Sequence, residues 1–390
     1  MAGDTHGFAS RLAPALLAWW DLHGRKDLPW QARDQDGGQH DHQHDHLHDK
    51  KRSAARYRVW VSEVMLQQTQ VATVKRYYPA FMQAFPDVRA LADAPIDEVL
   101  HHWSGLGYYA RARNLHKAAR LVRDQHRGEV PADFDTLHAL PGIGRSTAGA
   151  ILSLAGHQRH PILDGNVKRV LTRVFGVAGY PGDVAVAREL WALAEACTPT
   201  ARVADYTQAI MDLGATLCTR ASPDCAACPL SADCVARRDG LAAVLPARKT
   251  TRTRPLRAAV VLLCVRRDGA VLLERRPASG LWGGLWGLPE AGSVEAAASW
   301  CATTLGAPPV RERVQPVLRH GFTHFDLDMT PVELHLDAST TGPQASRVME
   351  AGRWLWYKVD APARVGLAAP TARLLAALEH TATPEGTDCR

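Results

Sequence analysis

The chain has 390 residues, 46% of them hydrophobic, which suits two globular domains and excludes a disordered protein. Its 46 basic and 40 acidic side chains leave a net charge of +6, which suits a polyanionic partner without identifying one. No segment has the apolar length of a membrane span or the pattern of a signal peptide, so we expect a cytoplasmic protein with no membrane partner.

The first 217 residues predict an all-α domain, because apolar side chains recur at helical spacing and no run alternates as a strand does. Residues 34–49 differ, since alternating histidines replace the apolar residues that packing needs. We expect residues 34–56 to be a low-complexity insertion on the surface. Glu63 lies inside an apolar helical face, where a carboxylate is more often paired at the edge than catalytic.

A turn at Leu140-Pro141-Gly142-Ile143-Gly144 separates two helical patterns. Glycine tolerates positive φ and lets backbone N–H groups approach a ligand, and a helix start favours an anion such as a DNA phosphate. Gly142 and Gly144 are therefore candidate DNA-binding residues, although such turns are as often purely structural. Asp164 precedes a further helical pattern, where its simplest role is an N-cap.

Four cysteines follow within seventeen residues, at C-x6-C-x2-C-x5-C spacing. They are Cys218, Cys225, Cys228 and Cys234. In a cytoplasmic protein this spacing indicates a metal site rather than disulfides, and the spacing alone allows either zinc or an iron–sulfur cluster.

Residues 235–256 are basic and lack periodicity, which indicates a linker before a second domain at 257–383. Strand-like runs surround an Asp268-Gly269 turn and predict a hairpin, and patterns at 314–318, 324–336 and 355–358 predict further strands of an α+β domain. Residues 281–290 resemble the loop that precedes the helix of a Nudix fold. Residues 296–305, in the place of that helix, include no acid, so we expect no pyrophosphohydrolase activity.

Together these motifs resemble the MutY-type adenine DNA glycosylases of the endonuclease III-like superfamily. The resemblance rests on residues 61–70 (VSEVMLQQTQ) and 105–111 (GLGYYAR), the hairpin, the cysteine spacing and the second domain. It implies a multidomain fold, in which an all-α helix-hairpin-helix glycosylase domain at 1–234 carries a [4Fe-4S] cluster loop and precedes an α+β Nudix-like domain that recognises the lesion.

The resemblance also implies a monofunctional base excision repair enzyme. Its substrate would be duplex DNA in which adenine is mispaired with 8-oxoguanine or guanine, and its reaction the hydrolysis of the N-glycosidic bond of that adenine. We expect a monomer, associated with the nucleoid in the bacterial cytoplasm.

The family's general acid falls on Glu63 and its second carboxylate on Asp164, with Asn166 beside it. A neutral carboxyl must protonate adenine N7, and an ionised one must face the positive charge that grows on the sugar. Other roles are carried over by position. The adenine pocket takes Trp30, Gln31, Leu66 and Gln208, and contacts with DNA fall on Gln68, Thr69, Leu106, Tyr108, Gly142, Gly144, Arg220, Phe322, Thr323 and His324.

Ser146 stands in the substrate site where bifunctional relatives carry a lysine that attacks C1′, which implies a glycosylase without lyase activity. Thr323 departs from the family's Phe-Ser-His loop by an added methyl group. Two alternatives remain open. An endonuclease III-like pyrimidine glycosylase and lyase is disfavoured by Ser146 and by the second domain, and a non-catalytic DNA-binding or redox-sensing protein by the presence of both carboxylates.

Overall fold

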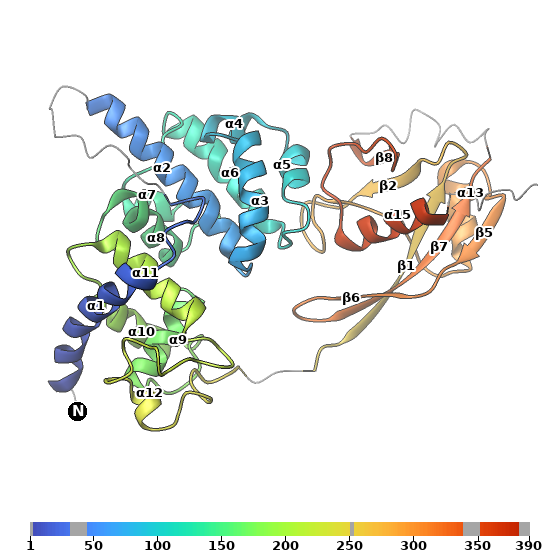
Figure 1. Cartoon of the computed structure of the whole chain (residues 1–390). Helices are drawn as coiled ribbons and strands as arrows, with labels where there is room; N and C mark the ends of the chain where they lie inside the picture. Colours follow the sequence, from blue (N-terminus) through green and yellow to red (C-terminus); the bar gives the residue numbers. More distant parts are fainter. Residues whose placement is uncertain (1–2, 32–44, 250–252, 338–351, 382–390) are drawn as a thin grey trace, which may run out of the picture. The chain divides into compact units, whose positions relative to one another are not determined.

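The chain forms two compact units in a computed structural model (Figure 1). The structure describes residues 3–31, 45–249, 253–337 and 352–381. Unit 1 comprises Met1–Asp93 with Asn114–Thr251, and unit 2 comprises Ala94–Arg113 with Arg252–Arg390. The predicted order of an all-α part before an α+β part is confirmed, since no strand occurs among the described residues before Leu256. No helix in the described ranges has the length and apolar character to cross a membrane.

Helices make up the whole regular structure of unit 1 in its described residues. Their bounds are α1 Gly3–His23, α2 Asp45–Leu66, α3 Val71–Ala84, α4 Val88–Asp93, α7 Phe134–His138, α8 Arg145–Gly156, α9 Gly165–Phe175, α10 Val184–Cys197, α11 Val203–Thr216 and α12 Val235–Arg238. Two further helices belong wholly or partly to unit 2, namely α5 Ile96–His102 and α6 Ala110–Gln125, which continues into unit 1.

Helix α2 begins earlier than the sequence pattern indicates. Residues 34–44 lie outside the described part, but residues 45–56, which we expected to belong to the surface insertion, form the first turns of this helix. Ser53 and Arg56 are buried there because both bond to the backbone of Val130. The Val130 N–H donates to Ser53 Oγ at 2.9 Å, and Arg56 Nε donates to the Val130 carbonyl at 2.9 Å. Polar side chains therefore fix a segment that has no apolar periodicity.

The core of unit 1 gathers around α9, where Val167, Val170 and Leu171 are buried together with Leu12 and Leu16 of α1. Helix α9 also contacts α10, α11 and α12. Each buried apolar side chain contributes about 1.5–3 kcal/mol relative to an exposed one, so this packing holds α9 firmly. The position of residue 164, immediately before α9, is fixed as a result.

Unit 2 contains a mixed sheet between two helices. The strands are β1 Leu256–Val265, β2 Val271–Arg275, β3 Trp286–Gly287, β4 Glu290–Ala291, β5 Arg311–Val314, β6 Leu318–Gly321, β7 Asp326–His335 and β8 Trp354–Tyr357, and the helices are α13 Ala296–Leu305 and α15 Ala369–Thr381. Strands β1 and β7 are parallel, whereas every other pairing of named strands is antiparallel. Val261 and Leu263 share a core with α15, and Leu262 and Cys264 share one with α13, as the alternation of a two-sided strand requires.

The predicted hairpin around Asp268-Gly269 is confirmed, with Val265 paired to Val271 and Gly269 at φ 78°. The strand predicted at 314–318 is instead two short strands. Both β5 and β6 pair with the long strand β7, and residues 315–317 connect them. One long partner can hold two short neighbours, a pairing that local sequence does not reveal.

Candidate active site

The hairpin lies between α7 and α8 and has the predicted turn. Gly142 has φ 81°, and a Cβ there would lie 2.8 Å from Asn114 Cβ, so the position requires glycine. Gly144 differs from the expectation, because its φ of −85° is open to any residue and a Cβ would meet nothing within 4 Å. As N-cap of α8 it supplies no side chain, which leaves the first backbone N–H groups of the helix without a side-chain cap.

Ser146, in the first turn of α8, ties this helix to the segment before α9. Its Oγ accepts a hydrogen bond from the Leu163 N–H at 2.9 Å. A lysine at this position could not accept that bond, because an ammonium group only donates. The hydroxyl thus sets the backbone next to Asp164.

Asp164 is the N-cap of α9, and its Oδ1 accepts a hydrogen bond from the Val167 N–H at 2.7 Å. Burial raises the pKa of this carboxyl, while the backbone N–H groups of Val167 and Asn166 and the charges of Arg169 and Lys168 oppose the rise. The net direction is upward. The hydrogen bonds and cations lower the pKa of Asp164 relative to that of an equally buried carboxyl without such partners, and so favour its ionised form.

Glu63 lies on α2 near Asp164 and has a different environment. Burial, and to a smaller extent the Asp164 charge, raise the pKa of Glu63 from 4.5 to about 8. Among the described residues, no hydrogen bond or salt bridge reaches its carboxyl group. A carboxyl with a pKa of about 8 keeps its proton at neutral pH, so Glu63 is the neutral member of the pair.

Asn166 lies two residues after Asp164 and is fixed by Arg169 and by contact with α11. Arg169 Nη2 donates to Asn166 Oδ1 at 2.8 Å and to the Gly214 carbonyl of α11 at 2.6 Å. A Cβ on Gly214 would lie 2.6 Å from Asn166 Cβ, so glycine allows α11 to approach the start of α9 this closely. Sequence reasoning did not single out Gly214, whose role depends on a contact between residues 48 positions apart.

A pocket of about 330 Å³ opens in unit 1. It is lined by Trp20, Lys26, Trp30, Gln31, Val59, Leu154, His157, Ala204, Asp205 and Gln208. Three of the four predicted pocket residues are therefore brought together, whereas Leu66 is not among the lining residues. Val59 lies one helical turn before Glu63, so both side chains are on the same face of α2. Trp20 was missed because its place in an amphipathic helix indicates an ordinary core residue.

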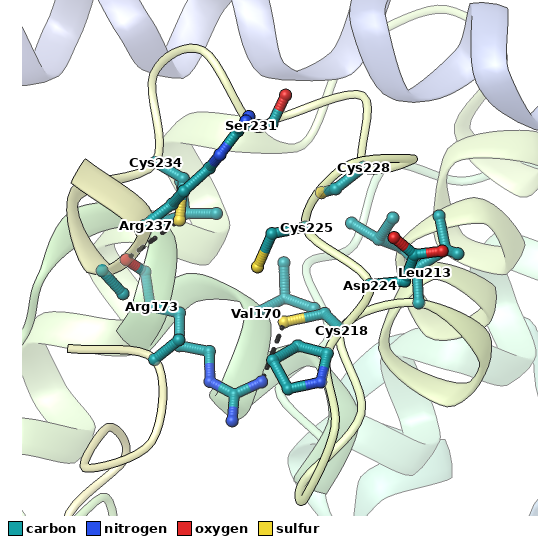
Figure 2. A pocket seen from close by; sticks show the side chains of 15 residues that line it. Val170, Arg173, Leu213, Cys218, Asp224, Cys225, Cys228, Ser231, Cys234 and Arg237 are labelled. Carbon is teal, nitrogen blue, oxygen red and sulfur yellow. Dashed lines mark hydrogen bonds between the residues drawn. The ribbon is translucent and has the colours of Figure 1, made fainter. Parts of the chain in front are cut away.

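The four cysteines surround one hollow, which they share with apolar side chains of α9 and α11 (Figure 2). Arg173 of α9 holds the first cysteine loop, as its guanidinium donates to Cys218 Sγ at 3.4 Å and to the Thr219 carbonyl at 2.6 Å. Within the described ranges, no three His, Cys, Asp or Glu side chains are arranged as ligands of a metal ion. Four thiols around a common hollow nevertheless form a donor set that suits zinc or an iron–sulfur cluster.

Arg220 lies in the same loop as Cys218. Its backbone carbonyl accepts a hydrogen bond from Arg173 Nη2 at 3.2 Å, and the residue is exposed.

The turn after α2 contains a residue with left-handed backbone. Gln68 is exposed and has φ 58°, and the Thr69 N–H donates to the Leu66 carbonyl at 3.2 Å. A positive φ at a non-glycine residue is uncommon and often marks a functional position.

In unit 2, the loop from Leu106 to Tyr108 also has a left-handed residue. Tyr108 has φ 47° and is 50% exposed, whereas Leu106 is buried. Arg111 braces the loop by donating to the Leu106 and Gly107 carbonyls at 3.2 Å, and its guanidinium lies 5.6 Å from the Tyr108 ring. An exposed aromatic ring on a braced loop suits stacking on a base.

The predicted lesion-recognition residues follow β6 in unit 2. Phe322 packs against Phe325, with ring centroids 4.6 Å apart, and against Trp282 at 5.3 Å. Thr323 and His324 are exposed beside it. The aromatic cluster thus anchors the loop, and the two polar side chains remain accessible to a ligand.

Comparisons with known proteins match both parts of the chain. Residues 61–196 match the HhH-GPD superfamily of base excision DNA repair proteins, and residues 260–377 match the NUDIX domain. An adenine DNA glycosylase of Buchnera aphidicola subsp. Acyrthosiphon pisum (strain APS) is 33% identical over 361 residues, which cover 92% of this chain and 95% of the relative. The Homo sapiens adenine DNA glycosylase is 34% identical over 397 residues, with 87% of this chain and 69% of the relative covered.

A solved structure of a thermostable thymine-DNA glycosylase is also similar. It is 25% identical, the match covers 59% of this chain and 97% of that one, and the TM-score is 0.49.

Proposed function

This chain belongs to the adenine DNA glycosylase family, and from that premise we propose that it removes adenine mispaired with 8-oxoguanine or guanine in duplex DNA. As a member of the family it is an enzyme, a base excision repair glycosylase. The observation that carries the proposal is the pair of neighbouring carboxyls, of which Glu63 has its pKa raised to about 8. A neutral and a charged acid together are what hydrolysis of an N-glycosidic bond needs.

Glu63 supplies the proton in this mechanism. Adenine is a poor leaving group until its N7 is protonated, and a carboxyl with a pKa of about 8 still holds its proton at pH 7. Val59, on the same face of α2, lines the pocket, so a base in that pocket would lie close to the acid. The base must first leave the duplex, at a cost of a few kcal/mol for unstacking.

Asp164 faces the sugar as the bond to C1′ breaks. Positive charge then grows on the ring, and an ionised carboxylate stabilises that charge or captures C1′ covalently before water completes the hydrolysis. The N-cap hydrogen bond from Val167 holds the carboxylate in place. Asn166, braced by Arg169, completes the site.

We assign DNA binding to three groups of residues. The uncapped start of α8 at Gly142 and Gly144 suits a phosphate, as does exposed Arg220. Gln68 and Thr69 of unit 1 are candidates to fill the space left by a flipped base. Leu106 and Tyr108 of unit 2 are candidates to contact DNA bases by insertion or stacking. Phe322, Thr323 and His324 are the candidates to contact the opposite 8-oxoguanine.

We further propose that Cys218, Cys225, Cys228 and Cys234 hold a [4Fe-4S] cluster. When bound, such a cluster stabilises the loop that follows α11 by joining its four thiolates. Zinc has the same donor preference, so family membership decides between them here. We also propose that the enzyme acts as a monomer in the cytoplasm, where bacterial chromosomal DNA is found.

Single-turnover base release tests the proposed function directly. Duplexes carry adenine opposite 8-oxoguanine, guanine or thymine, and a fourth carries an oxidised pyrimidine opposite adenine. We expect adenine release from the first two and little from the third and fourth. Release of the oxidised pyrimidine, with no release of adenine, would instead support an endonuclease III-like activity.

A further inference from the structure

Asp212 of α11 is buried beneath the pocket and gathers donors from three segments. Its side chain is 1% exposed. Arg25 donates to it through Nε at 2.9 Å, through Nη2 at 2.6 Å and through its backbone N–H at 2.9 Å. Trp20 Nε1 donates at 3.3 Å. A buried carboxylate with this many donors is fixed in position and stays an acceptor at both oxygens.

Gln208, one helical turn earlier on α11, completes this set. Its Nε2 donates to Asp212 Oδ1 at 2.8 Å, and its side chain also lines the pocket. A carboxylate only accepts hydrogen bonds, so the amide nitrogen of Gln208 must face Asp212. The carbonyl oxygen is the end of the amide left for a ligand, and no hydrogen bond to Gln208 Oε1 occurs among the described residues.

The apolar part of the pocket wall suits a flat ring, and Lys26, Gln31, His157 and Asp205 also line the pocket. The indoles of Trp20 and Trp30 and the side chains of Val59 and Leu154 contribute to its wall. Away from bulk water, two hydrogen-bond acceptors that face each other raise the free energy of binding, whereas an acceptor that faces an N–H donor lowers it.

We propose that Asp212 is a positioning residue that fixes the polarity of the Gln208 amide, so that the pocket selects a base with an exocyclic amine over one with a carbonyl at the same place. The inference rests on the proposed function, since it assumes that the excised base enters this pocket. Arg25 and Trp20 hold Asp212, and Asp212 holds Gln208. Selectivity at the pocket therefore depends on a carboxylate that does not touch the base.

Hypoxanthine provides the probe, because it differs from adenine by a carbonyl in place of the amine. Single-turnover release is measured from duplexes with adenine or hypoxanthine opposite guanine, for the wild type, Asp212→Asn, Gln208→Met and the double variant. Asparagine keeps the shape of Asp212 but has one acceptor oxygen in place of two, so it cannot accept from Arg25, Trp20 and Gln208 as the carboxylate does, and the Gln208 amide is free to turn over. The ratio of adenine to hypoxanthine release should fall by about ten-fold or more in Asp212→Asn.

The double-variant cycle separates positioning from a general structural role. Without the Gln208 amide, Asp212→Asn should change the ratio no further. Tyr57→Phe is the matched control, because it removes a buried hydrogen bond to the Phe85 carbonyl at 2.8 Å elsewhere in unit 1. It should lower the melting temperature while keeping the wild-type ratio.

Three results would overturn the inference while leaving the proposed function in place. In the first, Asp212→Asn slows release of both bases by the same factor. In the second, it changes the ratio equally with and without the Gln208 amide. In the third, Tyr57→Phe narrows the ratio as much as Asp212→Asn does. Absence of adenine release by the wild type would contradict the proposed function itself.

Discussion

Two carboxyl groups of similar chemistry differ in this site because their partners differ. Asp164 caps a helix and accepts a backbone hydrogen bond, whereas Glu63 is buried without a donor or cation among the described residues. Burial therefore acts on Glu63 almost unopposed and raises its pKa to about 8. The local surroundings, rather than residue type, separate the proposed acid from the proposed carboxylate.

The raised pKa has a consequence for stability. Between pH 4.5, the ordinary pKa of glutamate, and about pH 8, the folded state binds more protons at Glu63 than the unfolded state. Stability therefore falls as pH rises through this window. Glu63→Gln removes this ionisation. Its melting temperature should therefore exceed that of the wild type at about pH 8 and match it near pH 4. Each kcal/mol of difference in the free energy of unfolding corresponds to about 2–4 °C.

Differential scanning calorimetry across pH measures this difference. Glu189→Gln, at an exposed position of α10, makes the same chemical change as a control and should show no such pH-dependent gain. A constant difference between Glu63→Gln and the wild type at every pH would show that Glu63 titrates as an ordinary surface acid.

Ser146 lacks the amine that lyase chemistry needs. Its hydroxyl is bonded to the Leu163 N–H, and it provides no amine to attack C1′. Borohydride should therefore trap little covalent enzyme–DNA product, and any weak trapping should disappear in Lys168→Ala. Efficient trapping that survives Lys168→Ala would indicate lyase chemistry from another amine.

Single site residues could be predicted from the sequence where their role depends on a local pattern. The hairpin glycine at 142 and the N-cap aspartate at 164 are examples, since turn geometry and helix capping depend on near neighbours. The bond from Arg25 to Asp212 joins residues 187 positions apart, and neither residue stands out in the sequence. Only the packing of α1 against α11 brings them together.

Helix α11 contacts the start of α9, next to the proposed catalytic residues Asp164 and Asn166. Gly214 allows this contact, because a Cβ there would lie 2.6 Å from Asn166 Cβ and 3.2 Å from its backbone. Gly214→Ala should therefore displace the start of α9, lower the melting temperature and slow adenine release by about ten-fold or more, as loss of oriented groups does.

Gly156→Ala in α8 is the matched control for Gly214→Ala. A Cβ at Gly156 would make only ordinary contacts, at 3.7 Å from Gln158, and alanine favours a helix by up to about 1 kcal/mol over glycine. It should keep wild-type release rates in the same single-turnover assay. Equal activity of both variants would show that the close approach at Gly214 has no role in the site.

Periodicity predicted most helices because their buried faces repeat every turn. It failed at residues 45–56 of α2, where Ser53 and Arg56 are buried through hydrogen bonds to Val130 rather than through apolar contacts. Periodicity also predicted one strand at 314–318 where the structure has β5 and β6, because both strands are defined by their pairing with β7. Long-range partners thus decide the elements that local pattern misses.

For the whole molecule, the cysteine hollow gives a prediction about composition. Four thiols at this spacing in an adenine DNA glycosylase should hold iron, so protein purified without air should contain about four iron and four sulfide per chain and absorb in the visible range. Cys225→Ser should lower both contents, whereas Cys301→Ser, in α13, should leave them unchanged. One zinc per chain without iron would contradict the cluster assignment.

The two-part organisation could be predicted from a change of periodicity near residue 256, because helices and strands repeat differently. The sequence does not predict that residues 94–113 belong to the same unit as the C-terminal sheet. This grouping depends on contacts such as the bond from Tyr109 Oη to the Leu367 carbonyl at 3.2 Å, which join distant parts of the chain.

Proton delivery from Glu63 to N7 is the step that makes adenine a leaving group in this mechanism, and an adenine analogue without N7 isolates that step. Single-turnover release is compared for adenine and 7-deazaadenine opposite 8-oxoguanine, with the wild type and Glu63→Gln, while DNA binding is measured in parallel. The wild type should release adenine at least about a hundred-fold faster than Glu63→Gln, and 7-deazaadenine should resist both enzymes equally while binding persists. Near wild-type release of adenine by Glu63→Gln would show that Glu63 does not deliver the proton.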